Sequence, residues 1–159
     1  MSKPPKPRTA LAAHIRRATI DDLDDLVELE NSAFAIERMS ARQLRRHLES
    51  LTAEILVATR ERHIVGAAVV FFRRRSDIAR LYSIAVAADD RGTGLGEALL
   101  ARVAHSARRR GDQRLRLEVR SDNQTAQRLY VRLGYRHFGS HSKYYEDGQD
   151  AFRYEKRLA

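Results

Sequence analysis

The sequence predicts one mixed α/β domain with seven strands and four helices in the order β α α β β β α β α β β. Apolar residues recur at helical spacing in four segments, while alternating or continuously apolar runs supply the strands. A third observation is the position of the glycines. Three of the eight, Gly92, Gly94 and Gly96, stand where a strand gives way to a helix. A chain of 159 residues has the length of one such domain.

The prolines mark the boundary between a tail and this domain. All three fall in the first seven positions, among basic residues. We therefore interpret residues 1–13 as a flexible basic tail and expect the domain to occupy 14–159. The chain has no cysteine, and no apolar run approaches the ~18–20 residues of a membrane span. These features exclude a disulfide framework, and we expect a cytoplasmic protein without membrane contact.

Two helices follow the opening strand. Thr19 precedes the first helix with Asp22 three positions on, which is the spacing of a capping box. Ser40 and Gln43 repeat that spacing before the second helix. Apolar residues at helical intervals follow both pairs. The first helix is expected over about 20–34 and the second over about 40–50.

The remaining segments alternate between strands and helices. Short polar turns separate the three strands that follow the second helix, so we expect these three strands to pair antiparallel. The run 114–120 alternates strictly between aliphatic and charged residues, which predicts one apolar and one polar face. The strands are expected at 54–59, 63–72, 78–87, 114–120, 135–144 and 150–158, with helices at 95–110 and 123–134.

The glycine cluster carries chemistry. The run Arg91-Gly92-Thr93-Gly94-Leu95-Gly96 follows an apolar strand and opens a helix. Backbone N–H groups that converge at a helix N-terminus favour a phosphate, and Arg91 adds a charge. Taken alone, the cluster is equally compatible with a tight turn. No Lys-Ser/Thr pair follows it, and the preceding strand does not begin a parallel unit, so the common nucleotide-binding loops are excluded.

Four motifs follow one another along about residues 14–158. They are Leu81-Tyr82-Ser83-Ile84-Ala85-Val86 with Arg91-x-x-Gly94-x-Gly96; Leu117-Glu118-Val119-Arg120-x-x-Asn123; Leu129-Tyr130-x-x-Leu133-Gly134-Tyr135; and Tyr144-Tyr145 before Asp147-Gly148 and Asp150. In this order they resemble the GNAT superfamily of N-acetyltransferases. The last three resemble, more narrowly, bacterial ribosomal-protein N-terminal alanine acetyltransferases.

The resemblance implies a fold and a cosubstrate. The fold is the mixed α/β GNAT fold, whose mostly antiparallel sheet is splayed between the fourth and fifth strands so that acetyl-coenzyme A wedges between them. The backbone of Ile84, Ala85 and Val86 would pair with the pantetheine arm. The pyrophosphate would bind the amides of residues 91–96, in agreement with the anion site argued from the glycines.

The resemblance also implies catalytic residues. Acetyl transfer requires a deprotonated amine, a donor for the tetrahedral oxyanion and a proton for the departing thiolate. By motif position, Glu118 is the general base, directly or through a water, and Tyr130 is the acid for the sulfur. The Val86 N–H is the oxyanion donor, and Asn123 binds the cosubstrate near the thioester.

Each of these side chains has a structural alternative. Glu118 shares a strand face with Arg116 and Arg120, so a ladder of surface ion pairs would also explain it. Tyr130 falls in the apolar stripe of a helix and would serve as a core aromatic. Asn123 would serve as a plain helix N-cap.

An acidic segment points to the acceptor. Glu30 lies seven residues after Leu23, on the apolar side of the first helix, where an unpaired carboxylate is costly. Glu30 either meets the incoming ammonium in the acceptor groove or pairs with an arginine. Six carboxylates stand within 21–30, a stretch that suits a peptide N-terminus, a lysine or a polyamine.

The acceptor loop departs from the family pattern. The ribosomal-protein acetyltransferases tend to carry a Pro-Trp pair after the position of Phe34, whereas this chain continues with residues 35–39, Ala-Ile-Glu-Arg-Met. A ribosomal-protein acceptor therefore does not follow from the resemblance. Tyr82, Tyr144 and Tyr145 are candidates for lining the acceptor groove, with strand packing as the alternative.

Net charge and composition separate the candidate functions. The formal charge of +9 suits an anionic cosubstrate, but it also suits nucleic acid. No stacking motif or recognition helix accompanies the charge, so nucleic acid is not the expected partner. The histidine spacing predicts no metal site.

We therefore expect an acetyl-CoA-dependent N-acetyltransferase that is a monomer or homodimer. It would act by direct attack in a ternary complex on a primary amine, foremost the α-amino group of a protein or peptide. The alternatives are a small-amine, polyamine or amino-acid N-acetyltransferase, a basic nucleic-acid-binding module and a non-catalytic coenzyme A binding module.

Overall fold

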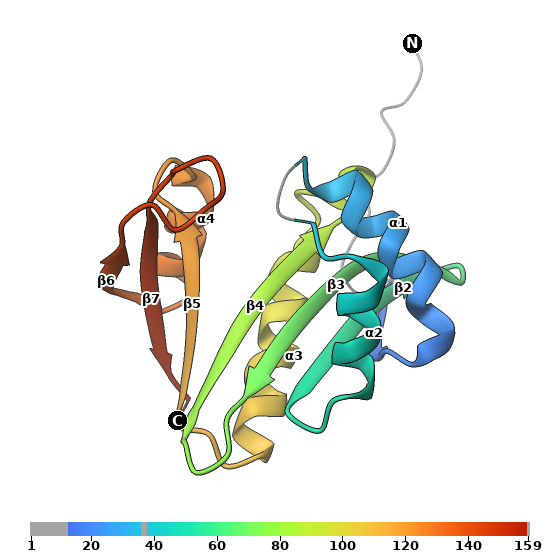
Figure 1. The fold of residues 1–159 in the computed structure, drawn as a ribbon, viewed down its shortest axis with the longest axis horizontal. Coiled ribbons are helices and arrows are strands. Elements are labelled where there is room, and N and C mark those ends of the chain that lie inside the picture. Colours follow the sequence, from blue (N-terminus) through green and yellow to red (C-terminus); the bar gives the residue numbers. More distant parts are fainter. Residues whose placement is uncertain (1–12, 36–37, 159) are drawn as a thin grey trace.

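Seven strands form a single mixed sheet in the computed structural model, which describes residues 13–35 and 38–158 (Figure 1). The spatial order is β1-β2-β3-β4-β5-β7-β6. Residues 1–12 of the predicted tail lie outside the described residues. The strands are β1 (His14–Arg17), β2 (Ala53–Arg60), β3 (His63–Phe72), β4 (Ile78–Val86), β5 (Arg114–Arg120), β6 (Arg136–His141) and β7 (Ala151–Arg157). The helices are α1 (Leu23–Ala33), α2 (Ala41–Glu49), α3 (Leu95–Arg109) and α4 (Gln124–Arg132).

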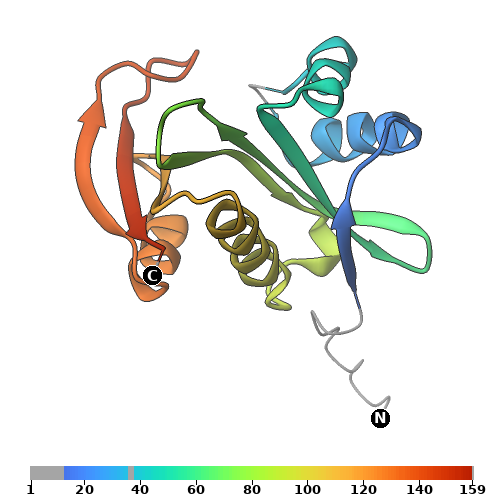
Figure 2. The ribbon, with the colours of Figure 1, turned by 90° about the horizontal axis from the view of Figure 1, so that it is seen from below.

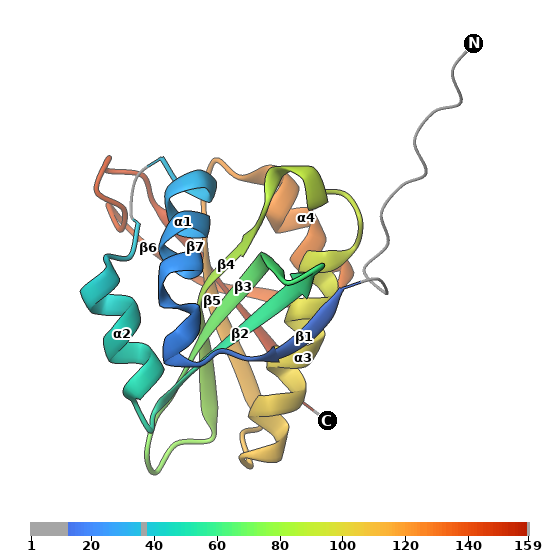
Figure 3. The same cartoon turned by 90° about the vertical axis from the view of Figure 1, so that its right-hand side faces the viewer.

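The helices form two layers around the sheet. Figure 2 shows α1 and α2 on one face and α3 and α4 on the other, and Figure 3 shows the same layers from the side. On the α3 side, Leu99 and Val103 are fully buried against the sheet. On the α1 side, Leu26 and Leu29 enter a second core. Full burial of each such side chain stabilises the fold by roughly 1.5–3 kcal/mol. The predicted mixed α/β fold is confirmed.

The sheet divides into a fork between β4 and β5. These strands run parallel and pair over only four positions, from Ile78 with Arg114 to Leu81 with Leu117. Beyond that point β4 continues to Val86 and β5 to Arg120, and the two strands diverge (Figure 1). The splayed sheet implied by the family resemblance is therefore confirmed.

A β-bulge lies in β4 where the fork opens. Val69 of β3 is opposite Ser83 and Val70 is opposite Leu81, so Tyr82 is the extra residue of β4. A bulge bends a strand and increases its local twist. Here it coincides with the point at which β4 leaves β5.

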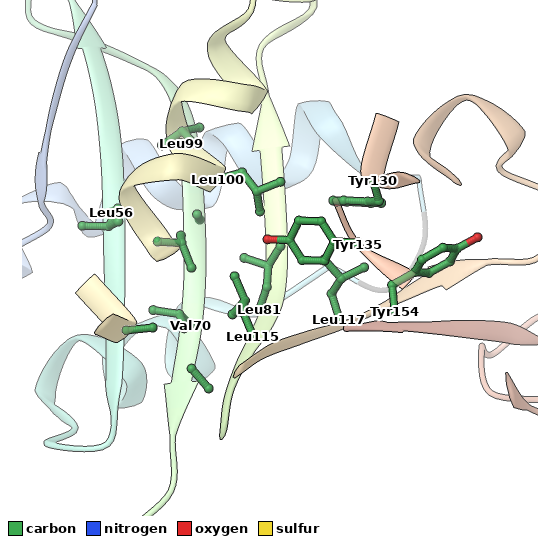
Figure 4. Close-up of a cluster of buried hydrophobic side chains, with 14 of the residues drawn as sticks. Leu56, Val70, Leu81, Leu99, Leu100, Leu115, Leu117, Tyr130, Tyr135 and Tyr154 are labelled. Carbon is green, nitrogen blue, oxygen red and sulfur yellow. The ribbon is translucent and has the colours of Figure 1, made fainter. Parts of the chain in front are cut away.

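An aromatic cluster on the β5 side of the fork shares one hydrophobic core with β4. Tyr130 on α4 meets Tyr135 edge to face, with ring centroids 5.5 Å apart, and lies 6.3 Å from the ring of Tyr154 on β7. Figure 4 shows the Tyr135 ring beside Leu81 of β4 and Leu117 of β5, with its hydroxyl directed toward Leu100 and Leu81, while Tyr130 and Tyr154 lie farther from Leu81. One core thus spans the base of the fork.

Two element boundaries differ from the predicted ones by three residues, and the other boundaries differ by at most two. The first predicted helix begins with a short 3-10 turn, Ile20–Asp22, and the α-helix starts only at Leu23. Asp22 accepts hydrogen bonds from the Thr19 N–H and from Arg16, which fix this turn. The sixth strand ends at His141 rather than at Tyr144. Lys143 has a φ of 50°, a left-handed conformation that lies outside regular strand geometry.

Candidate active site

A cavity of about 1330 Å³ occupies the opening of the fork. It is lined from both sides, by β4 and the turn into α3 and by β5, α4 and the segment after β6. Phe34 and Met39, which flank the α1–α2 connection, add an apolar wall. The predicted site residues among its lining are Tyr82, Ile84, Val86, Arg91, Gly92, Gly94, Leu95, Gly96, Glu118, Asn123, Tyr130, Tyr144 and Tyr145.

The glycine turn leads from β4 into α3. Gly92 and Gly94 have φ angles of 76° and 87°, a left-handed conformation that glycine adopts without strain. Inside the turn the Thr93 hydroxyl donates to the carbonyl oxygen of Asp90 at 2.6 Å. The buried Asp90 carboxylate forms an ion pair with Arg60 of β2, Nη2 to Oδ1 3.0 Å. These two contacts fix the turn to β2. The first N–H groups of α3, which have no partner within the helix, lie at the cavity.

Ala85 and Thr93 do not line the cavity. Ala85 is 6% exposed and packs in the core beneath α1, so only its backbone is available to a ligand. The Thr93 hydroxyl is used within the turn, as described above.

Glu118 lies on β5 just past the last position that pairs with β4. Its side chain is 9% exposed, and Oε2 is 3.0 Å from Nε of Arg80. The ion-pair alternative holds with other partners: Arg116 binds Glu155 and Arg120 binds Asp147, while Glu118 pairs with Arg80 and, at 3.9 Å, with Arg153. Glu118 therefore faces an arginine of β4 that the sequence motifs did not single out.

Tyr130 and Asn123 lie on the other side of the cavity. Tyr130 is 7% exposed, and burial raises the pKa of its hydroxyl to about 12. Tyr130 is the core aromatic that was expected as the alternative to a catalytic role, and it also lines the cavity. The Asn123 side chain accepts a hydrogen bond from the Ala126 N–H at 3.1 Å. The predicted N-cap is confirmed.

The three tyrosines that were predicted to line an acceptor groove all line the cavity. Tyr82 and Tyr144 are 43% and 40% exposed, and Tyr145 adjoins Tyr144 edge to face at 5.0 Å. Tyr82 stacks on Phe71 of β3 at 4.7 Å. The Tyr144 hydroxyl accepts a hydrogen bond from Nη2 of Arg80 at 2.5 Å.

Arg80 is the residue that sequence reasoning missed. Its only sequence signal is that it interrupts an apolar strand between Ala79 and Leu81.

Among the residues that the structure describes, Glu30 neither lines the cavity nor pairs with an arginine. It is 6% exposed, and its Oε2 accepts a hydrogen bond from the backbone N–H of Met39 at 2.9 Å. Burial raises the pKa of this carboxyl, while the Met39 hydrogen bond partly offsets that effect. Glu30 is not among the residues that line the cavity. It instead ties α1 to the segment before α2, which carries Met39.

In residues 13–35 and 38–158, no group of three or more His, Asp or Glu side chains is arranged to hold a metal ion. None of the helices described has the length and apolarity needed to cross a membrane.

Comparison with known proteins gives a consistent result. Residues 22–158 match the acetyltransferase (GNAT) domain family. A Bacillus subtilis (strain 168) protein provisionally named as a ribosomal protein bS18-alanine N-acetyltransferase is 31% identical over 140 residues, covering 87% of this chain and 91% of that protein. The solved ribosomal-protein-S18-alanine N-acetyltransferase of Escherichia coli aligns with a TM-score of 0.84 at 27% identity, over 92% of this chain and 94% of that one.

A ribosomal-protein-alanine N-acetyltransferase from Brucella melitensis gives a TM-score of 0.78 at 26% identity, over 91% of this chain and 99% of that one. The family match extends over most of the chain and contains both sides of the fork. The chain belongs to the GNAT acetyltransferase family.

Proposed function

We propose that this protein transfers the acetyl group of acetyl-coenzyme A to the α-amino group at the N-terminus of a protein or peptide. The observation that carries the proposal is that one cavity brings Glu118 and Tyr130 together with the glycine turn. The first two supply acid and base groups, and the third supplies an anion site. Relatives named for acetylating an N-terminal alanine support an α-amine as the acceptor.

The residues present fit acetyl-coenzyme A. The glycine turn offers N–H groups at the start of α3 for the pyrophosphate, and Arg91 stands beside them. On β4, Ile84, Ala85 and Val86 lie beyond the last position that pairs with β5, so their backbone is available to the pantetheine amides. The acetyl-coenzyme A molecule supplies an activated thioester.

The chain's own residues then serve the transfer. Glu118 accepts a proton from the acceptor ammonium, directly or through a water, so that the nitrogen lone pair attacks the thioester carbonyl. The Val86 N–H donates to the oxyanion. As the C–N bond forms and the C–S bond breaks, the nitrogen gives a second proton to water, Tyr130 gives its proton to the departing sulfur, and solvent then reprotonates Tyr130. Asn123 caps the helix that carries Tyr130 and so holds that hydroxyl in place.

A thiol-release assay tests this function. Purified protein and acetyl-coenzyme A are combined with peptides that begin with alanine or other residues, with a lysine peptide blocked at its N-terminus, with polyamines and with free amino acids. We expect release to be fastest with a free N-terminal peptide and to return to background when its N-terminus is already acetylated. If the coenzyme A thiol is released faster with a polyamine or an amino acid than with any peptide, the acceptor is a small amine and not a protein N-terminus. No acceleration by any acceptor would refute the enzyme activity.

A further inference from the structure

Arg80 joins the two sides of the fork. It lies on β4 opposite Arg116 of β5, one position before the last pair of the parallel ladder. Its Nε donates to Glu118 Oε2 at 3.0 Å, and its Nη2 donates to the Tyr144 hydroxyl at 2.5 Å. One guanidinium therefore contacts both the proposed base and a tyrosine of the acceptor side, 38 and 64 residues away in the sequence.

The two oxygens of Glu118 have different surroundings. Oε2 is held by Arg80, whereas Oε1 is 3.9 Å from Nε of Arg153, beyond hydrogen-bond distance. That Arg153 nitrogen is buried without a hydrogen-bond partner in the part of the chain that the structure describes. A carboxylate fixed through one oxygen keeps the other available as an acceptor. In the described residues Oε1 accepts no hydrogen bond and has only this longer ion pair with Arg153, so it is the oxygen left to accept the amine proton.

The same guanidinium restrains Tyr144. This residue stands after β6 with a 40% exposed side chain, packed against the rings of His141 and Tyr145. Its hydroxyl bond to Arg80 connects this segment to β4. Although burial opposes the charge of Arg80, Glu118 and Tyr144 raise its pKa, so the guanidinium remains a cation.

Arg80 is not itself among the residues that line the cavity, whereas Glu118 and Tyr144 both are. It therefore contacts these two side chains without occupying the space that a substrate would fill. The ion pair joins an Arg80 side chain that is 39% exposed to a Glu118 side chain that is 9% exposed. Its geometric consequence is that one rigid, planar guanidinium sets two side chains that line the cavity.

We propose that Arg80 is a positioning residue for acetyl transfer, whose guanidinium fixes the Glu118 carboxylate and the Tyr144 ring as one acceptor wall. This inference rests on the proposed function and deepens it. Arg80 acts on the acceptor side of the cavity, so its removal should affect the acceptor and leave acetyl-coenzyme A binding in place.

Steady-state kinetics of four variants test the proposal: Arg80→Gln, Tyr144→Phe, the double variant, and Arg116→Gln as a matched control on the same sheet face. Arg80→Gln should lower kcat/KM for the acceptor peptide about 10- to 100-fold and change KM for acetyl-coenzyme A less than about twofold. Tyr144→Phe should lower acceptor kcat/KM at least about threefold. The double variant should be no worse than Arg80→Gln, because both changes break one bridge. Arg116→Gln should behave as the wild type.

Arg80→Lys separates charge from geometry. Lysine keeps the positive charge but lacks the planar guanidinium that donates to two groups at once. Acceptor kcat/KM of Arg80→Lys should therefore stay at least about fivefold below wild type. Full activity in Arg80→Lys or Arg80→Gln, independent effects in the double variant, or an equal rise in KM for acetyl-coenzyme A would overturn the proposal. Melting temperatures check folding, and Tyr144→Phe decides the outcome if Arg80→Gln does not fold. A wild-type protein inactive toward every acceptor would instead refute the proposed function.

Discussion

Tyr130 experiences two environments at once, a packed aromatic cluster and the wall of a cavity. Because burial raises its pKa to about 12, the hydroxyl keeps its proton at any pH near neutrality. Such a phenol gives up its proton only where negative charge develops beside it, as on a departing thiolate.

We therefore expect Tyr130→Phe to lower kcat about 100-fold, since it removes the proton and keeps the ring. KM for the acceptor should change little. Thiol release under saturating substrates measures the effect, with Tyr154→Phe as the control because that ring lies in the same cluster but does not line the cavity. An unchanged kcat in Tyr130→Phe would assign the acid role to another group.

For single residues, the sequence predicts which side chains belong to the candidate site better than it predicts which groups they contact. Glu118 and Tyr130 could be singled out by motif, and both line the cavity. The partner of Glu118 could not, because Arg80 is 38 residues away and meets it only through the parallel ladder. Glu30 was expected to face an ammonium or an arginine, but a backbone N–H of Met39 lies nearest, and side-chain patterns do not reveal backbone donors.

The glycine turn into α3 gives a prediction at the scale of an element. Gly94 has a φ of 87°, whereas Gly96 lies inside the helix, where an added Cβ would find its nearest neighbour, Val86 Cγ2, at 3.9 Å. Gly94→Ala should therefore destabilise the protein by about 1–2 kcal/mol and raise KM for acetyl-coenzyme A. Gly96→Ala should leave stability equal or improve it by up to about 1 kcal/mol.

Urea unfolding of both glycine variants, with KM for acetyl-coenzyme A, measures this difference. Equal losses of stability would show that the left-handed conformation is not what the turn requires of Gly94.

The starts of helices and the ends of strands show which element boundaries a local sequence pattern can predict. The capping box at Ser40 is present, with Ser40 Oγ accepting from the Gln43 N–H at 3.1 Å, because its partners are three residues apart. The start of α1 was less predictable, since Asp22 is drawn into a turn by Arg16 of β1. The end of β6 depends on the left-handed conformation of Lys143, which no residue pattern indicated.

For the whole molecule, buried tyrosines predict how stability changes with pH. Burial raises the pKa of Tyr130 to about 12 and that of Tyr135 further, whereas an unfolded tyrosine titrates near 10. The folded state therefore binds more protons in this range, so the stabilisation is complete below about pH 10 and is lost as pH rises toward 12. The chain has only four lysines, so tyrosines dominate this titration.

We expect the free energy of unfolding to fall by about 2 kcal/mol between pH 8.5 and 11.5 on account of Tyr130 alone. Urea titrations at the two pH values measure the loss, and Tyr130→Phe should show a smaller one. The same decline in both proteins would mean that Tyr130 does not contribute.

The overall architecture was the most predictable level. Periodicity gave the number and order of elements, and the family resemblance gave the fork, which periodicity alone does not contain. The fork depends on pairing between β4 and β5, whose strands are separated in sequence by all of α3, and on a bulge at Tyr82. Such long-range pairing leaves no local trace in the sequence.

The fork also bears on how the protein avoids self-association. Beyond Leu81, β4 has lost its neighbour on one side, and a strand with unpaired N–H and C=O groups is a template onto which another chain adds to build an aggregate. In this molecule that edge lies in the middle of the sheet, flanked by the diverging β5 and by α3 and α4 (Figure 1). In the proposed function, acetyl-coenzyme A fills the space between β4 and β5 and so covers this strand edge, which leaves no room there for the strand of a second chain.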